Sequence, residues 1–133
     1  MARPDRIAYL DASALVKLVV AEPERPALVR HVREALLTTS ELAIVELTLA
    51  CRRAIQTPEA ERRARELLRD ISLVAADRAV LERAASAAPA SLRALDAIHL
   101  ATALAIEPDE FVAYDRRLLD AAREAGLMVA SPT

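Results

Sequence analysis

Four acidic residues of this chain have types and positions suited to metal or phosphate chemistry, and two of them, Asp11 and Asp115, follow short apolar runs. Asp11 comes directly after residues 7–10 and Asp115 after residues 110–114, and we expect both runs to be buried strands followed by helices. In open α/β sheets the ligand crevice lies outside the carboxyl ends of the strands, so both carboxylates can point into it. Taken alone, Asp11 is explained equally well as a helix cap, because Asp accepts hydrogen bonds from free helix N–H groups.

The other two acids, Glu46 and Asp96, interrupt apolar helical faces. Glu46 has leucines four residues before it and three residues after it, and Asp96 has leucines four residues away on both sides. An ionised carboxylate on an apolar stripe is costly unless it is paired or bound to a metal ion. For Glu46 a buried ion pair or a raised pKa is the structural alternative. Asp is also unfavourable inside a helix, because its side chain competes for the backbone.

Four converging carboxylates would repel each other at neutral pH, and a hard divalent cation removes that repulsion. Ligation by oxygen alone points to Mg²⁺ or Mn²⁺. Zinc is disfavoured, because the two histidines and the single cysteine lie far apart in the sequence. Acidic clusters of this kind are common in phosphodiester hydrolysis.

Two basic side chains near these acids are candidates for supporting roles. His99 lies three residues after Asp96 and can hydrogen-bond it or approach a phosphate; the alternative is a core histidine with its hydrogen bonds satisfied. Lys17 can contact phosphate from the first helix, and the alternative is a surface lysine whose stem covers apolar groups.

Alternating strand and helix patterns must position these residues. Strands are expected at residues 6–10, 36–38, 71–75, 110–114 and 127–130, and helices at residues 12–20, 26–35, 39–55, 58–70, 78–87, 91–106 and from 116 to Gly126. Thr38 and Glu41 match a capping box before the third helix, Asp77 caps the fifth, and Gly126 suits a left-handed position after the last. Such alternation predicts a parallel sheet covered on both faces.

Length and composition narrow the class of protein. The 133 residues fit a single domain over 1–133, and we expect a soluble, cytoplasmic protein because no apolar run reaches the roughly 18 residues that a membrane span needs. The net charge of −2 argues against binding through an overall basic surface, and an aromatic content of 2% argues against a base-stacking platform. The arginine-rich helix at residues 58–70 is interpreted as a solvated face with ion pairs, and an RNA-facing ridge is the alternative.

The four acids lie in segments that resemble the motifs of PIN-domain ribonucleases, specifically the VapC toxins of type II toxin–antitoxin pairs. The segments are residues 9–18, 40–46, 95–103 and 111–118, and the resemblance covers essentially the whole chain. It implies an α/β, PIN-like three-layer sandwich, whose five-stranded parallel sheet has the order 3-2-1-4-5 and is flanked by helices. In that order strands 1 and 4 are neighbours, so Asp11 and Asp115 face one another.

The resemblance further implies an endoribonuclease that depends on Mg²⁺ or Mn²⁺. Asp11, Asp96 and Asp115 would hold the metal, and Glu46 would complete the acidic pocket and orient the attacking water. The products implied are a 5′-phosphate and a 3′-hydroxyl. Ser13 is retained from the family pattern, where it supports the first Asp. Ala113 stands where Thr or Ser is frequent, which removes one possible hydrogen bond.

Partners also follow from the resemblance: an RNA substrate, a second copy of the chain in a homodimer, and a cognate VapB-type antitoxin, with operator DNA contacted only through the antitoxin and no membrane. Side chains around Val45 and Leu49 could supply dimer or antitoxin surface. One alternative is a non-catalytic PIN-fold module that binds RNA or protein, which predicts a missing acid, whereas all four are present. Another is a receiver-like phosphoryl acceptor at Asp11, which requires a second Asp beside it that the sequence lacks.

Overall fold

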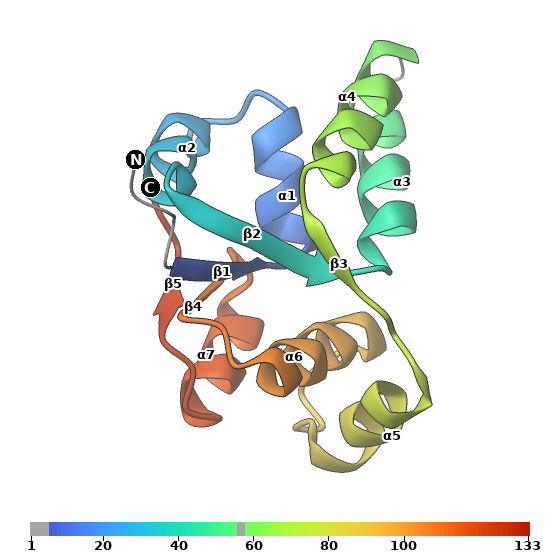
Figure 1. Ribbon diagram of the computed structural model, residues 1–133, viewed down its shortest axis with the longest axis vertical. Helices are drawn as coiled ribbons and strands as arrows, with labels where there is room; N and C mark the ends of the chain where they lie inside the picture. Colours follow the sequence, from blue (N-terminus) through green and yellow to red (C-terminus); the bar gives the residue numbers. More distant parts are fainter. Residues whose placement is uncertain (1–5, 56–57) are drawn as a thin grey trace.

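The computed structural model describes residues 6–55 and 58–133, and in this part of the chain a parallel sheet lies between two layers of helices (Figure 1). The strands are β1 (Arg6–Leu10), β2 (Ala35–Ser40), β3 (Ser72–Val74), β4 (Glu110–Val112) and β5 (Val129–Ala130). Their order across the sheet is β3-β2-β1-β4-β5, and every pairing is parallel. The predicted α/β class and the predicted strand order 3-2-1-4-5 are confirmed.

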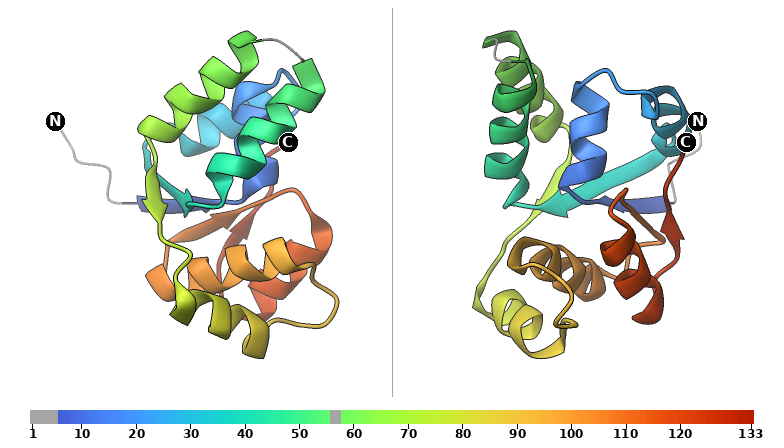
Figure 2. Two further views of the ribbon diagram at one scale, coloured as in Figure 1. Left: turned by 90° about the vertical axis from the view of Figure 1, so that its right-hand side faces the viewer. Right: turned by 180° about the vertical axis from the view of Figure 1, so that it is seen from behind.

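Four helices cover one face of the sheet and three cover the other (Figure 2). The first layer holds α1 (Ala12–Val19), α2 (Arg25–Val32), α3 (Ala43–Ile55) and α4 (Pro58–Arg69), and the second holds α5 (Arg78–Ala87), α6 (Ala94–Ile106) and α7 (Arg116–Glu124). The chain changes faces after β3, so that β4 and β5 are added on the other side of β1. The described residues contain no helix that is both long and apolar enough to cross a lipid bilayer.

Alternation along β1 divides the core between the two helix layers. Ala8 and Leu10 pack in the cluster formed with α1 to α4, whereas Tyr9 packs against Phe111 in the cluster formed with α6 and α7. The rings of Tyr9 and Phe111 stack with their centroids 5.4 Å apart. Successive side chains of a strand point to opposite faces, so Tyr9 must enter the second layer when its neighbours enter the first.

The predicted capping box at Thr38, with a helix beginning at Thr39, is wrong. β2 continues to Ser40, which pairs with Val74 of β3, and α3 begins only at Ala43. The Thr39 hydroxyl donates to the Leu10 carbonyl oxygen over 2.7 Å, which ties β2 to β1. Pairing with strands on both sides, together with the sheet preference of β-branched residues, outweighs the local helix-start pattern.

Two other local predictions are confirmed. Asp77 is the N-cap of α5, and its carboxylate accepts a hydrogen bond from the Val80 N–H at 3.0 Å. Gly126 has φ +97° after the end of α7, and the following N–H, that of Leu127, donates to the Ala122 carbonyl oxygen. This is the left-handed helix end that favours glycine. The remaining predicted ends differ from the observed ones by up to three residues.

Candidate active site

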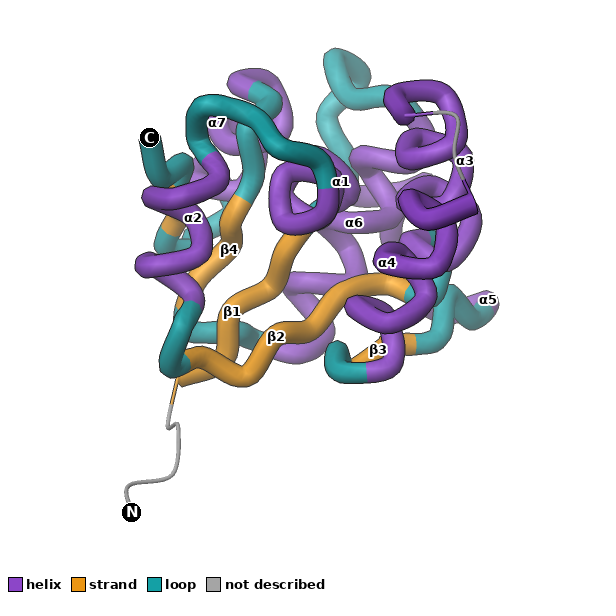
Figure 3. The backbone as a smooth tube through the Cα atoms, turned by 90° about the horizontal axis from the view of Figure 1, so that it is seen from above, coloured by secondary structure: helices purple, strands orange, loops and turns teal. Residues whose placement is uncertain are grey.

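Asp11 and Asp115 lie at the point where the sheet changes its direction of growth. β1 and β4 are adjacent and parallel, with Leu10 opposite Val112, and Figure 3 shows the two strands side by side. The chain leaves β1 into α1 on one face and leaves β4 into α7 on the other face. Diverging connections of this kind leave a crevice at the carboxyl ends of the strands.

Asp11 is buried, with 3% of its surface exposed, and its carboxylate caps α1 and lies near enough to Asp96 for the charge of Asp96 to raise its pKa. Its Oδ1 accepts hydrogen bonds from the Ser13 hydroxyl at 2.6 Å and from the Ala14 N–H at 3.0 Å. Within the described residues these are its side-chain hydrogen bonds, and both use Oδ1, which leaves Oδ2 for a ligand. The two roles weighed for Asp11 from the sequence are therefore compatible.

Ser13 connects the two turns that carry Asp11 and Asp115. Its hydroxyl oxygen donates to Asp11 and accepts from the Tyr114 N–H at 3.1 Å. Asp115 is the N-cap of α7, and its Oδ1 accepts from the Leu118 N–H at 3.1 Å. Ser13 thus holds the β4–α7 turn in place although Ala113 offers no hydroxyl for that purpose.

Glu46 is held by a chain of buried polar groups that runs through His99 to Tyr9. His99 Nε2 lies 2.7 Å from Glu46 Oε1, and His99 Nδ1 lies 2.7 Å from the Tyr9 hydroxyl. A carboxylate only accepts, so Nε2 carries a hydrogen, and in the neutral ring the Tyr9 hydroxyl donates to Nδ1. Burial raises the pKa of Tyr9, so its hydroxyl keeps its proton. His99 therefore orients Glu46, which is 53 residues away, rather than Asp96 on its own helix.

Tyr9 belongs to this arrangement, and sequence reasoning missed it. It lies inside the apolar run of β1 and is fully buried. The available signal was its type, because a buried Tyr hydroxyl usually needs a hydrogen-bond partner.

Asp96 and Asp115 line an open cleft at the N-terminal ends of α6 and α7, together with Ser91, Arg93, Arg116 and Arg117. Asp96 is half-buried and Asp115 is exposed. Partial burial raises the pKa of Asp96, and the negative charge of Asp115 adds to the rise, with a smaller addition from Glu46.

The same repulsion reaches Asp11. Burial is the main cause that raises the pKa of Asp11 to about 6; the hydrogen bonds from Ser13 and Ala14 and the charge of His99 oppose the rise, and the charge of Asp96 makes the smallest contribution to it. Among the described residues no Arg or Lys forms an ion pair with any of the four acids, and the one ion-pair partner is His99, on Glu46. His99 and Arg93 oppose the rise in the pKa of Asp96 through their charges, and the pKa still lies above its ordinary value.

The donor set fits a hard divalent cation. It consists of carboxylate oxygens at the N-terminal ends of α1, α3, α6 and α7. A hard divalent cation binds negatively charged oxygen ligands of this kind. In the described part of the chain, no three His, Cys, Asp or Glu side chains already stand close enough together to hold a metal ion.

Lys17 is engaged elsewhere. Its Nζ forms ion pairs with Glu22 and with Glu24, the latter at 3.2 Å, and it lies 4.7 Å from the centre of the Tyr114 ring. Because two carboxylates and an aromatic face already contact this ammonium group, a phosphate would have to displace them in order to bind it. These contacts argue against a phosphate role for Lys17, and with 14% of its side chain exposed it is a paired, mostly buried lysine rather than the surface lysine of the alternative.

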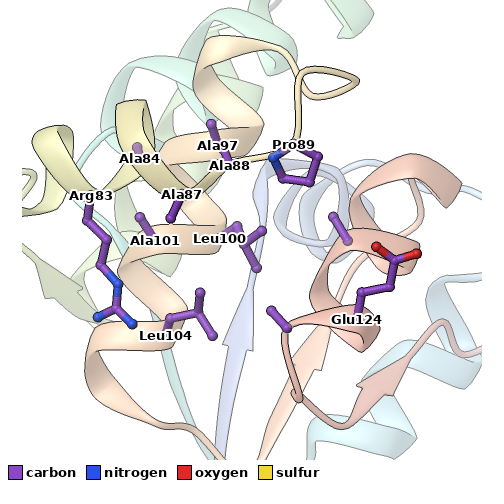
Figure 4. Close-up of a pocket in the computed structure, with 12 residues that line it drawn as sticks. Arg83, Ala84, Ala87, Ala88, Pro89, Ala97, Leu100, Ala101, Leu104 and Glu124 are labelled. Carbon is purple, nitrogen blue, oxygen red and sulfur yellow. The ribbon is translucent and has the colours of Figure 1, made fainter.

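A second hollow lies between α5, α6 and α7 and is lined mainly by alanine side chains, with Arg83 and Glu124 as its charged members (Figure 4). None of the candidate site residues lines it. This hollow is therefore separate from the candidate site residues.

Comparison with known proteins agrees with the fold. The family model described as PIN domain matches residues 8–124. Ribonuclease VapC46 of Mycobacterium tuberculosis is 41% identical over 129 residues, which cover 94% of this chain and 97% of that protein. The crystal structure of Mycobacterium tuberculosis VapC20, a sarcin-ricin loop cleaving toxin, superposes with a TM-score of 0.73 at 15% identity and covers 94% of this chain and 99% of that chain. VapBC2 from Rickettsia felis, bound to a DNA fragment from its promoter, superposes with a TM-score of 0.68 at 11% identity over 96% of this chain and 99% of that chain.

Proposed function

Because this chain belongs to the PIN-domain family, and within it to the VapC ribonucleases, we propose that it is a Mg²⁺- or Mn²⁺-dependent endoribonuclease and the toxin of a toxin–antitoxin pair. The resemblance predicted from the sequence is thereby confirmed at the level of the family. Metal dependence, the site residues and the partners are our proposal.

The observation that carries the proposal is the set of four carboxylates that lack a cationic partner from Arg or Lys among the described residues. Asp11, Glu46, Asp96 and Asp115 come from four helices and raise one another's proton affinity where pKa shifts are resolved. Asp11, Asp96 and Asp115 would hold the metal, and Glu46 would complete the pocket. A divalent cation in such a site supplies positive charge to the phosphate and to the leaving oxygen.

The chain's own side chains supply positioning and proton transfer. Ser13 fixes Asp11 through Oδ1, and His99 fixes Glu46 through Oε1, which leaves Oε2 to accept a proton from the attacking water. The water oxygen bonds to phosphorus as the bond from phosphorus to the 3′ oxygen breaks, and a proton passes to that oxygen. The products are a 5′-phosphate and a 3′-hydroxyl.

We infer an antitoxin of the VapB type as the partner, with contact to operator DNA made only by the antitoxin. The support is family membership together with the net charge of −2, which does not suit direct DNA binding. For a homodimer, the support is exposed apolar surface beside the acids: Ile44 and Val45 precede Glu46 and are 48% and 60% exposed, and Leu95 precedes Asp96 and is 47% exposed.

The test is a cleavage assay on labelled RNA with purified protein and a titration of Mg²⁺ and of Mn²⁺. We expect no cleavage in EDTA, saturable activation by either ion, and loss of cleavage in Asp11→Asn. Undiminished cleavage in EDTA would refute the metal dependence. RNA binding without cleavage at any metal concentration would instead support the non-catalytic module.

A further inference from the structure

We propose that Arg93, Arg116 and Arg117 form a binding site for an RNA phosphate next to the bond that is cut, so that the strand is held through its backbone. This inference rests on the proposed ribonuclease function and names how the substrate is held. The three arginines line the same cleft as Asp96 and Asp115.

These arginines are not held by paired acids in the described part of the chain, although the charge of Arg93 lowers the pKa of Asp96. All three are exposed, and within residues 6–55 and 58–133 none of their guanidinium groups forms an ion pair or a hydrogen bond. Arg116 and Arg117 follow Asp115 directly and still do not pair with it. Free cationic groups beside free carboxylates leave both sets available to a ligand.

Arginines of α3 and α4, by contrast, are paired with glutamates. Arg62 pairs with Glu59 and with Glu66, Arg63 pairs with Glu59, and Arg52 of α3 pairs with Glu61. A phosphate would have to break these pairs in order to bind. The arginine-rich helix is therefore the solvated face that the sequence suggested, and the phosphate site lies in the cleft instead.

A pocket of four carboxylates repels a polyanion, so the strand needs cationic groups close to the acids if it is to stay there. Arg suits this role because its planar fork gives two hydrogen bonds to phosphate. The N-terminus of α6 also favours an anion. Its N-cap residue, Arg93, forms no side-chain capping hydrogen bond and leaves first-turn N–H groups unsatisfied.

The residues that line the cleft also indicate which part of the RNA is recognised there. None of the residues that line the cleft is aromatic, so the cleft offers no surface for base stacking. Contacts to phosphate position a strand without reading its sequence. We therefore expect this site to raise affinity for RNA of any sequence, and sequence choice to come from elsewhere on the molecule.

The experiment compares two double variants that remove the same charge: Arg116→Gln with Arg117→Gln in the cleft, and Arg62→Gln with Arg63→Gln on α4. RNA binding is measured by fluorescence anisotropy in EDTA, and cleavage kinetics are measured with Mg²⁺ or Mn²⁺. For the cleft variant we expect affinity to fall by at least about tenfold, with a similar rise in KM and a change in kcat below about threefold. The slope of log K against log salt should become shallower by about 0.7 for each phosphate that the variant no longer neutralises. The α4 variant should stay close to the parent protein.

Each other outcome has a defined meaning. Equal effects of the two double variants would show a general charge effect and overturn the proposal, as would an effect confined to kcat. Unchanged RNA binding together with abolished antitoxin binding would assign the cleft to a protein partner and would also overturn it. If RNA binds as expected but is never cut, the proposed function fails while this site stands. A single Arg93→Gln variant with an unchanged melting temperature should show a smaller effect in the same direction.

Discussion

The two ends of the central strands carry acids of opposite character. Where β4 begins, Glu110 pairs with Arg6 at 2.8 Å and with His31, and Asp109 accepts a hydrogen bond from the Ile7 N–H at 2.7 Å. Where the same strands end, Asp11 and Asp115 have no such cationic partner among the described residues. An acidic side chain is paired with cations at one end, and acidic side chains at the other end have no such pair among the described residues.

This difference separates acids that hold the fold from acids that are available for chemistry. The pairs at the beginning of the strands join β1, α2 and β4 and satisfy each charge locally. The acids at the other end destabilise the metal-free fold, because burial and mutual repulsion raise the pKa values of Asp11 and Asp96. A buried acid whose pKa is raised and which no Arg or Lys of the described residues pairs with is a candidate for function, even where it also caps a helix.

The largest expected effect is the difference in kcat/KM between two variants, each with one acid substituted at one end of the strands. Asp96→Asn should lower kcat/KM by more than about 100-fold, since even residues that only support a metal ligand typically cost 10- to 100-fold. Glu110→Gln should leave kcat/KM within about threefold, because Glu110 lies at the opposite end of the strands. The measurement is RNA cleavage with Mn²⁺, with melting temperatures as a check on folding. Equal losses in both variants would remove the distinction between the two ends.

The second prediction concerns the stability of the metal-free protein as a function of pH. The folded-state pKa of Asp11, about 6, lies above its ordinary value of 3.8, so between these pH values the folded protein binds more protons than the unfolded chain. Its contribution to the free energy of unfolding therefore falls as pH rises through this window and is constant above it. Asp11→Asn, which can still cap α1, should be more stable than the parent at pH 7.5 by about 1–3 kcal/mol, and the gap should close near pH 4.

Urea unfolding in EDTA between pH 4 and pH 8 measures this difference. Saturating Mg²⁺ should stabilise the parent by about 2.7 kcal/mol at 100 times the dissociation constant and should reverse the order of the two proteins. A parent that is the more stable of the two at pH 7.5 in EDTA would contradict the account of Asp11.

The third prediction tests the chain that holds Glu46. Tyr9→Phe removes the hydrogen bond to His99 Nδ1 and keeps the stacking on Phe111, so Glu46 loses orientation while the core stays filled. We expect kcat to fall by about tenfold with little change in KM. The matched control is Tyr114→Phe, which loses its hydrogen bond to the Pro132 carbonyl oxygen and leaves His99 untouched. A change in KM alone, or equal effects of the two variants, would speak against a positioning role for Tyr9.

The sequence was sufficient for features that local patterns carry. Apolar runs that end in Asp predicted two acids at the carboxyl ends of neighbouring strands, and strand–helix alternation predicted a parallel sheet covered on both faces. Local pattern gave a wrong helix start at Thr38. The conformation of this segment is determined by pairing of β2 with β1 and β3, which involves residues about 30 positions away. Local pattern also could not predict that Tyr9 and Glu46 both contact His99. They lie 90 and 53 residues from it in the sequence, and contacts at such separations leave no periodic signal. Which arginines are free could not be predicted either, because it depends on side-chain contacts.

The smallest effect is expected at the paired end of the strands, and it completes the comparison. Arg6→Gln removes one of two cationic partners of Glu110, while His31 remains in contact with it. The Glu110 side chain is 13% exposed and that of Arg6 is 36% exposed, so the pair is partly screened by solvent and its removal should cost about 1 kcal/mol or less. Urea unfolding measures the cost, and kcat/KM should not change, because no acid of the cleft contacts this network. If cleavage fell while stability held, charge at the two ends of the sheet would be coupled, and the division between structural and functional acids would not hold for this protein.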